Sequence, residues 1–178
     1  MIYPTHIEYH GKYKINTSYK VAMRCMEISE DEKIDDVERS IAIVTLLFGD
    51  KIPVNQKTIN LAIKFLQCGK TRDENKIKKK DMDFQQDEGL IEASFMGDYQ
   101  IDLSESEIHW WKFCNLISGL SPKCALNRVR EIRNYDISKI SDKKTREKII
   151  SAQQQVALRK TISLEEQEII DEFENQFI

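Results

Sequence analysis

The chain has 178 residues, of which 40% are hydrophobic and 32% are charged, and its formal net charge is -3. This composition excludes a disordered chain, which would be poorer in apolar residues, and a membrane-embedded protein, which would be poorer in charges. The longest apolar run, residues 41–48, is far shorter than the roughly 20 residues that cross a bilayer. With 6 Gly and 3 Pro, the chain also lacks the frequent turns of an all-β sandwich. We therefore expect a soluble, mainly helical protein without membrane contacts.

The N-terminal half predicts a hairpin followed by three helices. Strand-forming residues at 7–9 and 13–15 flank a turn that contains Gly11, a residue with the backbone freedom of a tight turn. The three helices are predicted from residue 17 or 18 to 28, from 29–31 to 48, and from a cap at Asn55 to 68. One apolar stripe of the second helix consists of Ile34, Val37, Ile41, Val44, Leu47 and Phe48.

The C-terminal half predicts five more helices after a basic, solvated loop at 70–81. The first of the five is predicted from about residue 84. Cap signals then predict helices opened by Ser104 with Glu107, by Ser121 with Pro122, by Asp142, and by Ser163 with Glu166. We thus expect a mainly α fold of seven or eight helices with a small N-terminal β-hairpin, in which residues 1–160 form a helical domain and 161–178 form an acidic amphipathic helix.

Cysteines and histidines form no pattern that is typical of a metal or cofactor site. The cysteines contain no CxxC pair and no dense disulfide spacing, which predicts buried thiols in a reducing compartment; they are Cys25, Cys68, Cys114 and Cys124. No basic segment followed by an apolar one, as in a secretory signal, opens the sequence. We expect a cytoplasmic protein without metal or cofactor.

Two features are similar to catalytic motifs but lack the residues that would complete them. Gly69-Lys70-Thr71 matches the end of a phosphate-binding loop, yet Lys64 stands where such a loop requires glycine. His109 has no serine or cysteine near it in an obvious nucleophile and base arrangement. We therefore expect no enzymatic activity and no catalytic residues.

Four aromatic residues are candidates for partner binding. Trp110 and Trp111 are adjacent and point about 100° apart on a helix, so we expect one in the core and the other half exposed or at an interface. Apolar residues recur at helical spacing around this pair, so we expect at least one indole to be largely buried. Burial of a wide helix face inside the monomer is the alternative to an interface. Phe173 and Phe177 lie one turn apart in a segment with six acidic residues and no basic one. A basic partner is implied, which is either another protein or the basic segment 139–160 of the same chain.

A nucleic-acid-binding module is the alternative that the charge pattern keeps open. Six basic residues lie between 70 and 80, and Arg128, Arg130 and Arg133 follow on a predicted helix. The acidic net charge gives no general attraction to a polyanion. We therefore expect nucleic acid not to be the partner.

Several motifs in the middle of the chain resemble one protein family. They are Gln67–Lys70, Leu90–Phe95, Tyr99–Leu103, Ile108–Phe113 and Leu116–Leu120. Together they are similar to the bacteriophage gene-product-fifteen family, whose members are tail-region proteins of long-tailed phages and prophages of Gram-positive bacteria. The similarity extends over about residues 9–151, and its most specific element is His-Trp-Trp-Lys-Phe at 109–113.

The resemblance implies a tail assembly chaperone, a small protein that coats the long tape-measure helix until the tail tube polymerises around it. It also permits a minor structural tail protein. No catalytic or cofactor residues come with this family. The expected partners are the tape-measure protein or other tail proteins, with a further copy of this chain as the alternative.

Overall fold

The computed structural model describes residues 2–70 and 80–159. Within these residues the fold consists of seven α-helices, one 3-10 turn and one two-stranded hairpin. The predicted mainly α class with a small N-terminal hairpin is confirmed. The helix predicted over 163–178, and positions 71–79 of the predicted basic loop, lie outside the described residues.

The described residues gather into two compact units. Unit 1 consists of residues 2–70 and 108–113. Unit 2 consists of residues 80–107 and 114–159. The predicted division of the chain at residue 160 stays a prediction.

Unit 1 begins with the hairpin, in which β1 (His6–Glu8) pairs antiparallel with β2 (Lys12–Lys14). Gly11 in the turn has a φ of 148°, a value that L side chains rarely adopt. The hairpin is tied to the helices by Asn55, whose side-chain amide donates a 2.6 Å hydrogen bond to the Tyr9 hydroxyl. This contact supplies the support that an isolated hairpin lacks in water.

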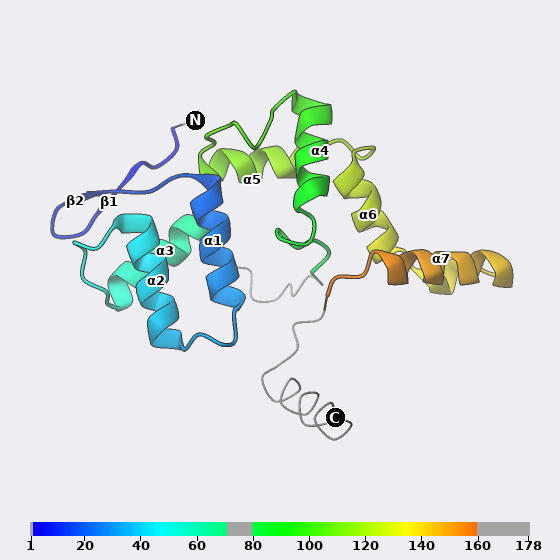
Figure 1. Cartoon of the computed structure of the whole chain (residues 1–178), viewed down its shortest axis with the longest axis horizontal. Helices are drawn as coiled ribbons and strands as arrows, with labels where there is room; N and C mark the ends of the chain where they lie inside the picture. The colour runs from blue at the N-terminus through cyan, green and yellow to red at the C-terminus, as the bar shows by residue number, and fades with distance from the viewer. Residues whose placement is uncertain (1, 71–79, 160–178) are drawn as a thin grey trace, which may run out of the picture. The chain divides into compact units, whose positions relative to one another are not determined.

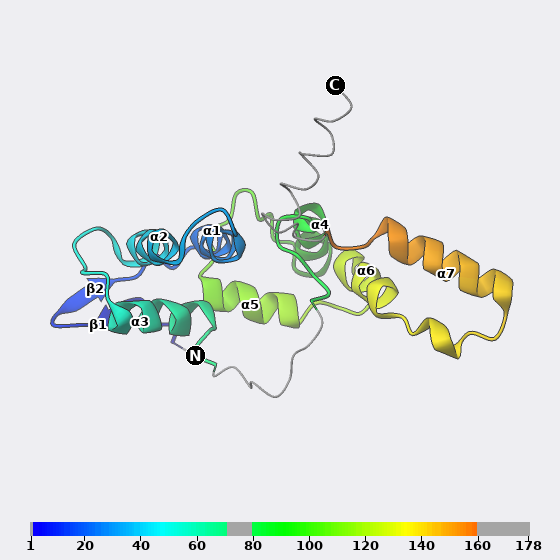
Figure 2. The same cartoon turned by 90° about the horizontal axis from the view of Figure 1, so that it is seen from below.

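Three helices form most of unit 1 (Figure 1): α1 (Tyr19–Glu30), α2 (Asp36–Phe48) and α3 (Gln56–Leu66). α1 and α2 lie side by side in both views, and α2 also packs against α3 (Figures 1 and 2). Their buried apolar residues recur at helical spacing and are Tyr19, Ala22, Cys25, Ile28, Val44, Leu47, Phe48, Ala62 and Phe65.

Local caps set the starts of α2 and α3. As predicted, α3 follows Asn55, which forms a reciprocal capping box with Thr58. α2 begins at Asp36 and not at residues 29–31. The reason is that the Asp35 carboxylate accepts hydrogen bonds from the backbone N–H groups of Val37 and Glu38, which satisfies donors at the helix start.

Unit 2 contains α4 (Glu88–Tyr99), α6 (Ala125–Asn134) and α7 (Lys143–Gln155), and α6 packs against both of the others (Figure 1). A 3-10 turn, η1 (Ile137–Lys139), connects α6 to α7. The start of α7 at the predicted Asp142 cap is confirmed. Helix α5 (Trp110–Ser118) begins in unit 1 and continues into unit 2. The buried residues of unit 2 are Asp87, Ile91, Ser94, Phe95, Leu103, Leu120, Cys124 and Leu126.

Two predicted capping serines serve other purposes. Ser104 donates its N–H and its hydroxyl to the Asp102 carboxylate in a turn, so no helix starts there, and α5 begins at Trp110. Ser121 likewise bonds to Asp98 through its N–H and its hydroxyl, and Cys124 takes the N-cap position of α6. In both cases a carboxylate competes successfully for the hydroxyl.

Candidate functional site

The two adjacent tryptophans attach the start of α5 to the end of α3 within unit 1. The indole N–H of Trp110 donates to the carbonyl oxygen of Leu66 at 2.9 Å, and that of Trp111 donates to the carbonyl oxygen of Phe65 at 2.8 Å. Both carbonyls lie in the last turn of α3, where a helix runs out of its own N–H donors. The tryptophan pair therefore caps the C-terminal end of α3.

The two indoles differ in burial, as predicted. Trp110 is 2% exposed and stacks on Phe113, whereas Trp111 is half-buried and stacks on Phe65. Trp110 and Phe113 form the buried face of α5.

His109 positions this tryptophan pair. Its Nδ1 accepts a 3.1 Å hydrogen bond from the backbone N–H of Trp111, and its Nε2 lies 2.9 Å from the carbonyl oxygen of Pro4. A backbone N–H can only donate and a carbonyl oxygen can only accept, so the neutral ring carries its proton on Nε2. Both ring nitrogens are thereby occupied by the protein's own backbone, and the ring also stacks on Tyr3. The arrangement is that of a helix cap.

Gly69 gives Trp111 the space that it occupies. A Cβ at this position would lie 2.9 Å from Cη2 of the indole, closer than real Cβ contacts. Its φ of 71° is also a conformation that favours glycine. α3 ends at Leu66, two residues before the predicted end at 68, and Cys68 already has a positive φ of 56°. Gly69 lies in the turn that follows and allows the indole to pack on the chain.

These positions decide what is left for a partner. Trp110 has almost no exposed surface in this conformation, so Trp111 is the member of the pair that retains accessible area. Partner binding by either residue stays a prediction. Phe173 and Phe177, the other two predicted contact residues, lie outside the described residues.

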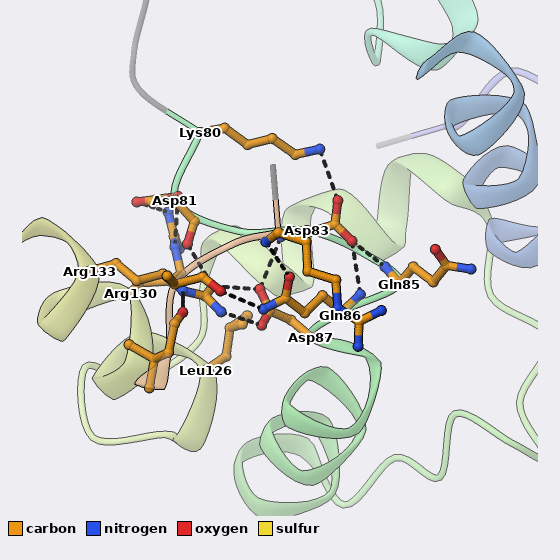
Figure 3. Close-up of polar contacts among 12 residues, drawn as sticks. Lys80, Asp81, Asp83, Gln85, Gln86, Asp87, Leu126, Arg130 and Arg133 are labelled. Atoms are coloured by element: carbon orange, nitrogen blue, oxygen red, sulfur yellow. Dashed lines mark hydrogen bonds and ion pairs between the residues drawn. The ribbon is translucent and has the colours of Figure 1, made fainter. Parts of the chain in front are cut away.

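Unit 2 contains a buried ion pair that sequence reasoning missed (Figure 3). Both terminal nitrogens of Arg133 bond to the Asp87 carboxylate, at 2.7 and 2.8 Å, and the two side chains are 8% and 1% exposed. The same guanidinium donates to the backbone carbonyls of Asp81 and Val156. Arg133 therefore joins α6 to the start of α4 and to the end of α7, with its donors satisfied inside the protein.

Arg130 makes a second, partly exposed pair beside the first (Figure 3). Its guanidinium bonds to both carboxylate oxygens of Asp81, at 3.1 and 3.2 Å, and Asn134 donates to the same carboxylate at 2.8 Å. Partial burial alone would raise the pKa of Asp81, but the hydrogen bonds from Arg130 and Asn134 and the charge of Arg130 outweigh it and lower that pKa. Two of the three arginines considered for nucleic-acid binding are thus bonded to carboxylates of their own chain, with Arg128 left on the exposed surface.

The exposed apolar residues include two that lie one turn apart on α2. Val37 is 69% exposed and Ile41 is 46% exposed. Acidic residues surround them in sequence, whereas the exposed surface of α7 is basic and includes Lys144 and Lys148. Exposed apolar residues of this kind are suited to protein contacts.

Two properties of the described residues concern thiol and metal chemistry. Burial raises the pKa of the Cys25 thiol to about 12, so that it stays protonated at neutral pH. No three metal-binding side chains gather in residues 2–70 and 80–159 in a way that would hold an ion. In the same part of the chain, every helix is too short or too polar to cross a membrane.

Comparison with known proteins matches the chain to a protein family. The family model described as Bacteriophage Gp15 protein matches residues 3–158 of the chain. Neither a curated protein nor a solved structure matches it.

Proposed function

Because the chain belongs to the Bacteriophage Gp15 protein family, we propose that it acts in phage tail assembly, as a chaperone that holds the tape-measure protein until the tail tube forms around it. The family match carries this proposal, since it makes the chain a phage-related protein and covers most of its length. The more specific role, that of a tail assembly chaperone, is supported by the motifs at 67–70 and 108–113, which resemble those of phage tail-region proteins.

The described surface supports a role through protein contacts. The tape-measure protein of a long-tailed phage is a long helix, and recognition of an amphipathic helix requires exposed apolar anchors spaced by about one helical turn. Val37 and Ile41 on α2 have this spacing and exposure. Trp111, half-buried at the start of α5, is a further apolar contact residue of the same unit.

The proposed role is non-enzymatic and takes place in the cytoplasm of the bacterial host. The partner is the tape-measure protein or another tail protein, with no role for a cofactor, a membrane or nucleic acid. The exclusion of nucleic acid is supported by two arginines, Arg130 and Arg133, that are already paired with carboxylates of this chain. A phosphate group would have to displace these carboxylates in order to bind either arginine.

Co-expression tests this function. The tape-measure protein encoded by the same phage is produced alone, with the full chain, and with an unrelated acidic helical protein of similar size. We expect the soluble fraction of the tape-measure protein to rise only with the full chain, and the two proteins to co-purify. An insoluble tape-measure protein in all three cultures, or equal rescue by the unrelated protein, contradicts the chaperone role.

A minor structural tail protein is the competing function. It is distinguished by the fate of the chain, which is absent from finished tails if it is a chaperone and present if it is structural. Mass spectrometry of purified virions measures this directly.

A further inference from the structure

The apolar stripe of α2 continues beyond the part of the helix that the core covers. Val37, Ile41, Val44 and Phe48 follow the spacing i, i+4, i+7 and i+11 and so lie on one face. Val44 and Phe48, in the C-terminal half, are 1% and 6% exposed. Val37 and Ile41, in the N-terminal half, are 69% and 46% exposed. The helix thus presents an apolar surface, one turn long, that continues the line of the buried residues and that none of residues 2–70 and 80–159 covers.

The surroundings of this surface are acidic. Residues 29–40 contain six carboxylates and two basic side chains. Asp36 and Glu38 precede and follow Val37 and therefore lie about 100° to either side of it on the helix. Both are exposed.

Arg39 offsets part of this charge, because it pairs with Asp36, but carboxylates still outnumber basic side chains in the segment. Its guanidinium donates at 2.7 Å to the carbonyl oxygens of Asp31 and Ile34, and it also pairs with Asp36. These bonds fasten the loop before α2 onto the helix and hold the acidic residues in place. The remaining carboxylates, including Glu38, set the sign of the surface.

We propose that the α2 face, defined as Val37 and Ile41 with Asp36 and Glu38 beside them, docks a basic amphipathic helix of a partner protein. The two apolar side chains insert into the apolar stripe of the partner helix, and its Lys and Arg residues pair with the carboxylates on both sides. This inference rests on the proposed function and deepens it, because it assigns the surface and the charge of the tape-measure segment that is bound.

Charge complementarity distinguishes between the possible binding partners of the α2 face. The acidic segment 161–178 of this chain would place its carboxylates against Asp36 and Glu38, which opposes binding. Nucleic acid and an anionic lipid surface are repelled for the same reason. A helix whose polar side is basic satisfies both the apolar and the charged parts of the α2 face.

Two synthetic peptides test the surface without the tape-measure protein. Both are 18-residue amphipathic helices with leucine on one side, and the polar side is lysine in one and glutamate in the other. We expect the full chain to bind the lysine peptide, with an affinity that falls as salt is raised, and not to bind the glutamate peptide. Fluorescence anisotropy of labelled peptide measures both. Absence of lysine-peptide binding, or equal binding of both peptides, overturns the proposal.

Variants locate the binding surface. The double variant Val37→Gln and Ile41→Gln keeps good helix formers at exposed positions, and we expect about a tenfold or greater loss of lysine-peptide affinity. The control is Met96→Gln on α4, an equally exposed apolar residue (44%) in unit 2, which leaves the affinity unchanged. Unchanged affinity in the double variant, at an unchanged melting temperature, overturns the assignment. If the double variant has a lower melting temperature than the wild type, the milder variant Glu38→Gln is used instead. We expect Glu38→Gln to reduce both the affinity for the lysine peptide and the dependence of that affinity on salt.

Co-expression with the tape-measure protein separates this inference from the proposed function. If the wild-type chain rescues the tape-measure protein and the double variant does not, both stand. Equal rescue by the double variant leaves the chaperone role intact and overturns the α2 face as its surface. Lysine-peptide binding at the α2 face without any rescue supports the surface and contradicts the chaperone role.

Discussion

The indole nitrogen of Trp110 lies 2.9 Å from the carbonyl oxygen of Leu66, so a tryptophan side chain completes the hydrogen bonding at the end of a helix that lies far earlier in the chain. Together with the contact from Trp111 to Phe65, this bond makes the start of α5 part of the same unit as α1, α2 and α3. The proposed docking surface belongs to that unit. The stability of this unit, and with it of the docking surface, therefore depends on the tryptophan pair.

Replacement of Trp110 tests this dependence. Trp110→Ala removes a buried aromatic side chain and is expected to lower the free energy of unfolding by about 3–5 kcal/mol. Trp110→Phe keeps most of the apolar volume but leaves the Leu66 carbonyl without its donor, at a cost of about 1–3 kcal/mol. Urea unfolding measures both, with the exposed Lys112→Ala as control. A loss below about 1 kcal/mol for Trp110→Ala contradicts a central position of this residue.

Gly69→Ala is expected to destabilise the protein by more than about 1 kcal/mol, because φ is positive at this position and the new methyl group would approach Trp111 at 2.9 Å. The matched control is Gly89→Ala in α4, where a Cβ meets nothing within 4 Å. That change is expected to stabilise the helix by roughly 0.5–1 kcal/mol. Effects of the same sign in thermal melts of the two variants would count against this account of Gly69.

The buried pair of Arg133 and Asp87 makes a third prediction. Arg133→Met leaves the Asp87 carboxylate buried without its partner and is expected to cost about 3–5 kcal/mol. Arg128→Met on the same helix changes an exposed arginine and is expected to cost less than about 0.5 kcal/mol. If chemical denaturation gives equal losses for the two arginines, the ion pair does not organise unit 2.

Acid should weaken unit 2 through Asp81 and Asp83. Burial acts to raise the pKa of Asp83, but hydrogen bonds from the Gln86 backbone and from Lys80 lower it, and the pKa of Asp81 is lowered as well. A carboxyl with a lowered folded-state pKa contributes stability that is present above its unfolded pKa, about 3.9, and is lost as the pH falls through its folded value.

The stability of the protein should therefore fall as the pH is lowered below about 4. Asp81→Asn removes one of the two groups and should flatten this dependence, whereas Asp50→Asn, at an exposed position, should follow the wild type. The dependence of the melting temperature on pH is measured between roughly pH 2.5 and 7, a range that spans the folded and unfolded pKa values of these carboxyls. An identical slope for Asp81→Asn and wild type would contradict the assignment.

Features that depend on neighbouring residues were predictable from the sequence. The caps at Asn55 and Asp142 bond to N–H groups three residues further on, so residue type and spacing were enough to find them. The turns at Gly11 and at Gly69, which lies just beyond the end of α3, follow from glycine's tolerance of positive φ.

Features that depend on distant residues were not predictable. Ser121 has the residue type of a helix cap, but Asp98, on another helix, captures its N–H and hydroxyl. Leu66, which accepts from Trp110, and Asp87, which pairs with Arg133, lie 44 and 46 positions away from them, and one sequence gives no distance between such residues. The exposure of Val37 and Ile41 was hidden for the same reason, since the apolar stripe on which they lie looks the same whether or not another element covers it.

The central claim is that the chain binds the tape-measure protein directly, and the mass of the isolated complex tests this most directly. The full chain and the co-expressed tape-measure protein are purified together and passed through size-exclusion chromatography with light scattering at low and at high salt. The account predicts a complex that contains both proteins at low salt, and loss of that complex with Val37→Gln and Ile41→Gln. Separate elution of the wild-type chain and a soluble tape-measure protein at low salt would contradict it.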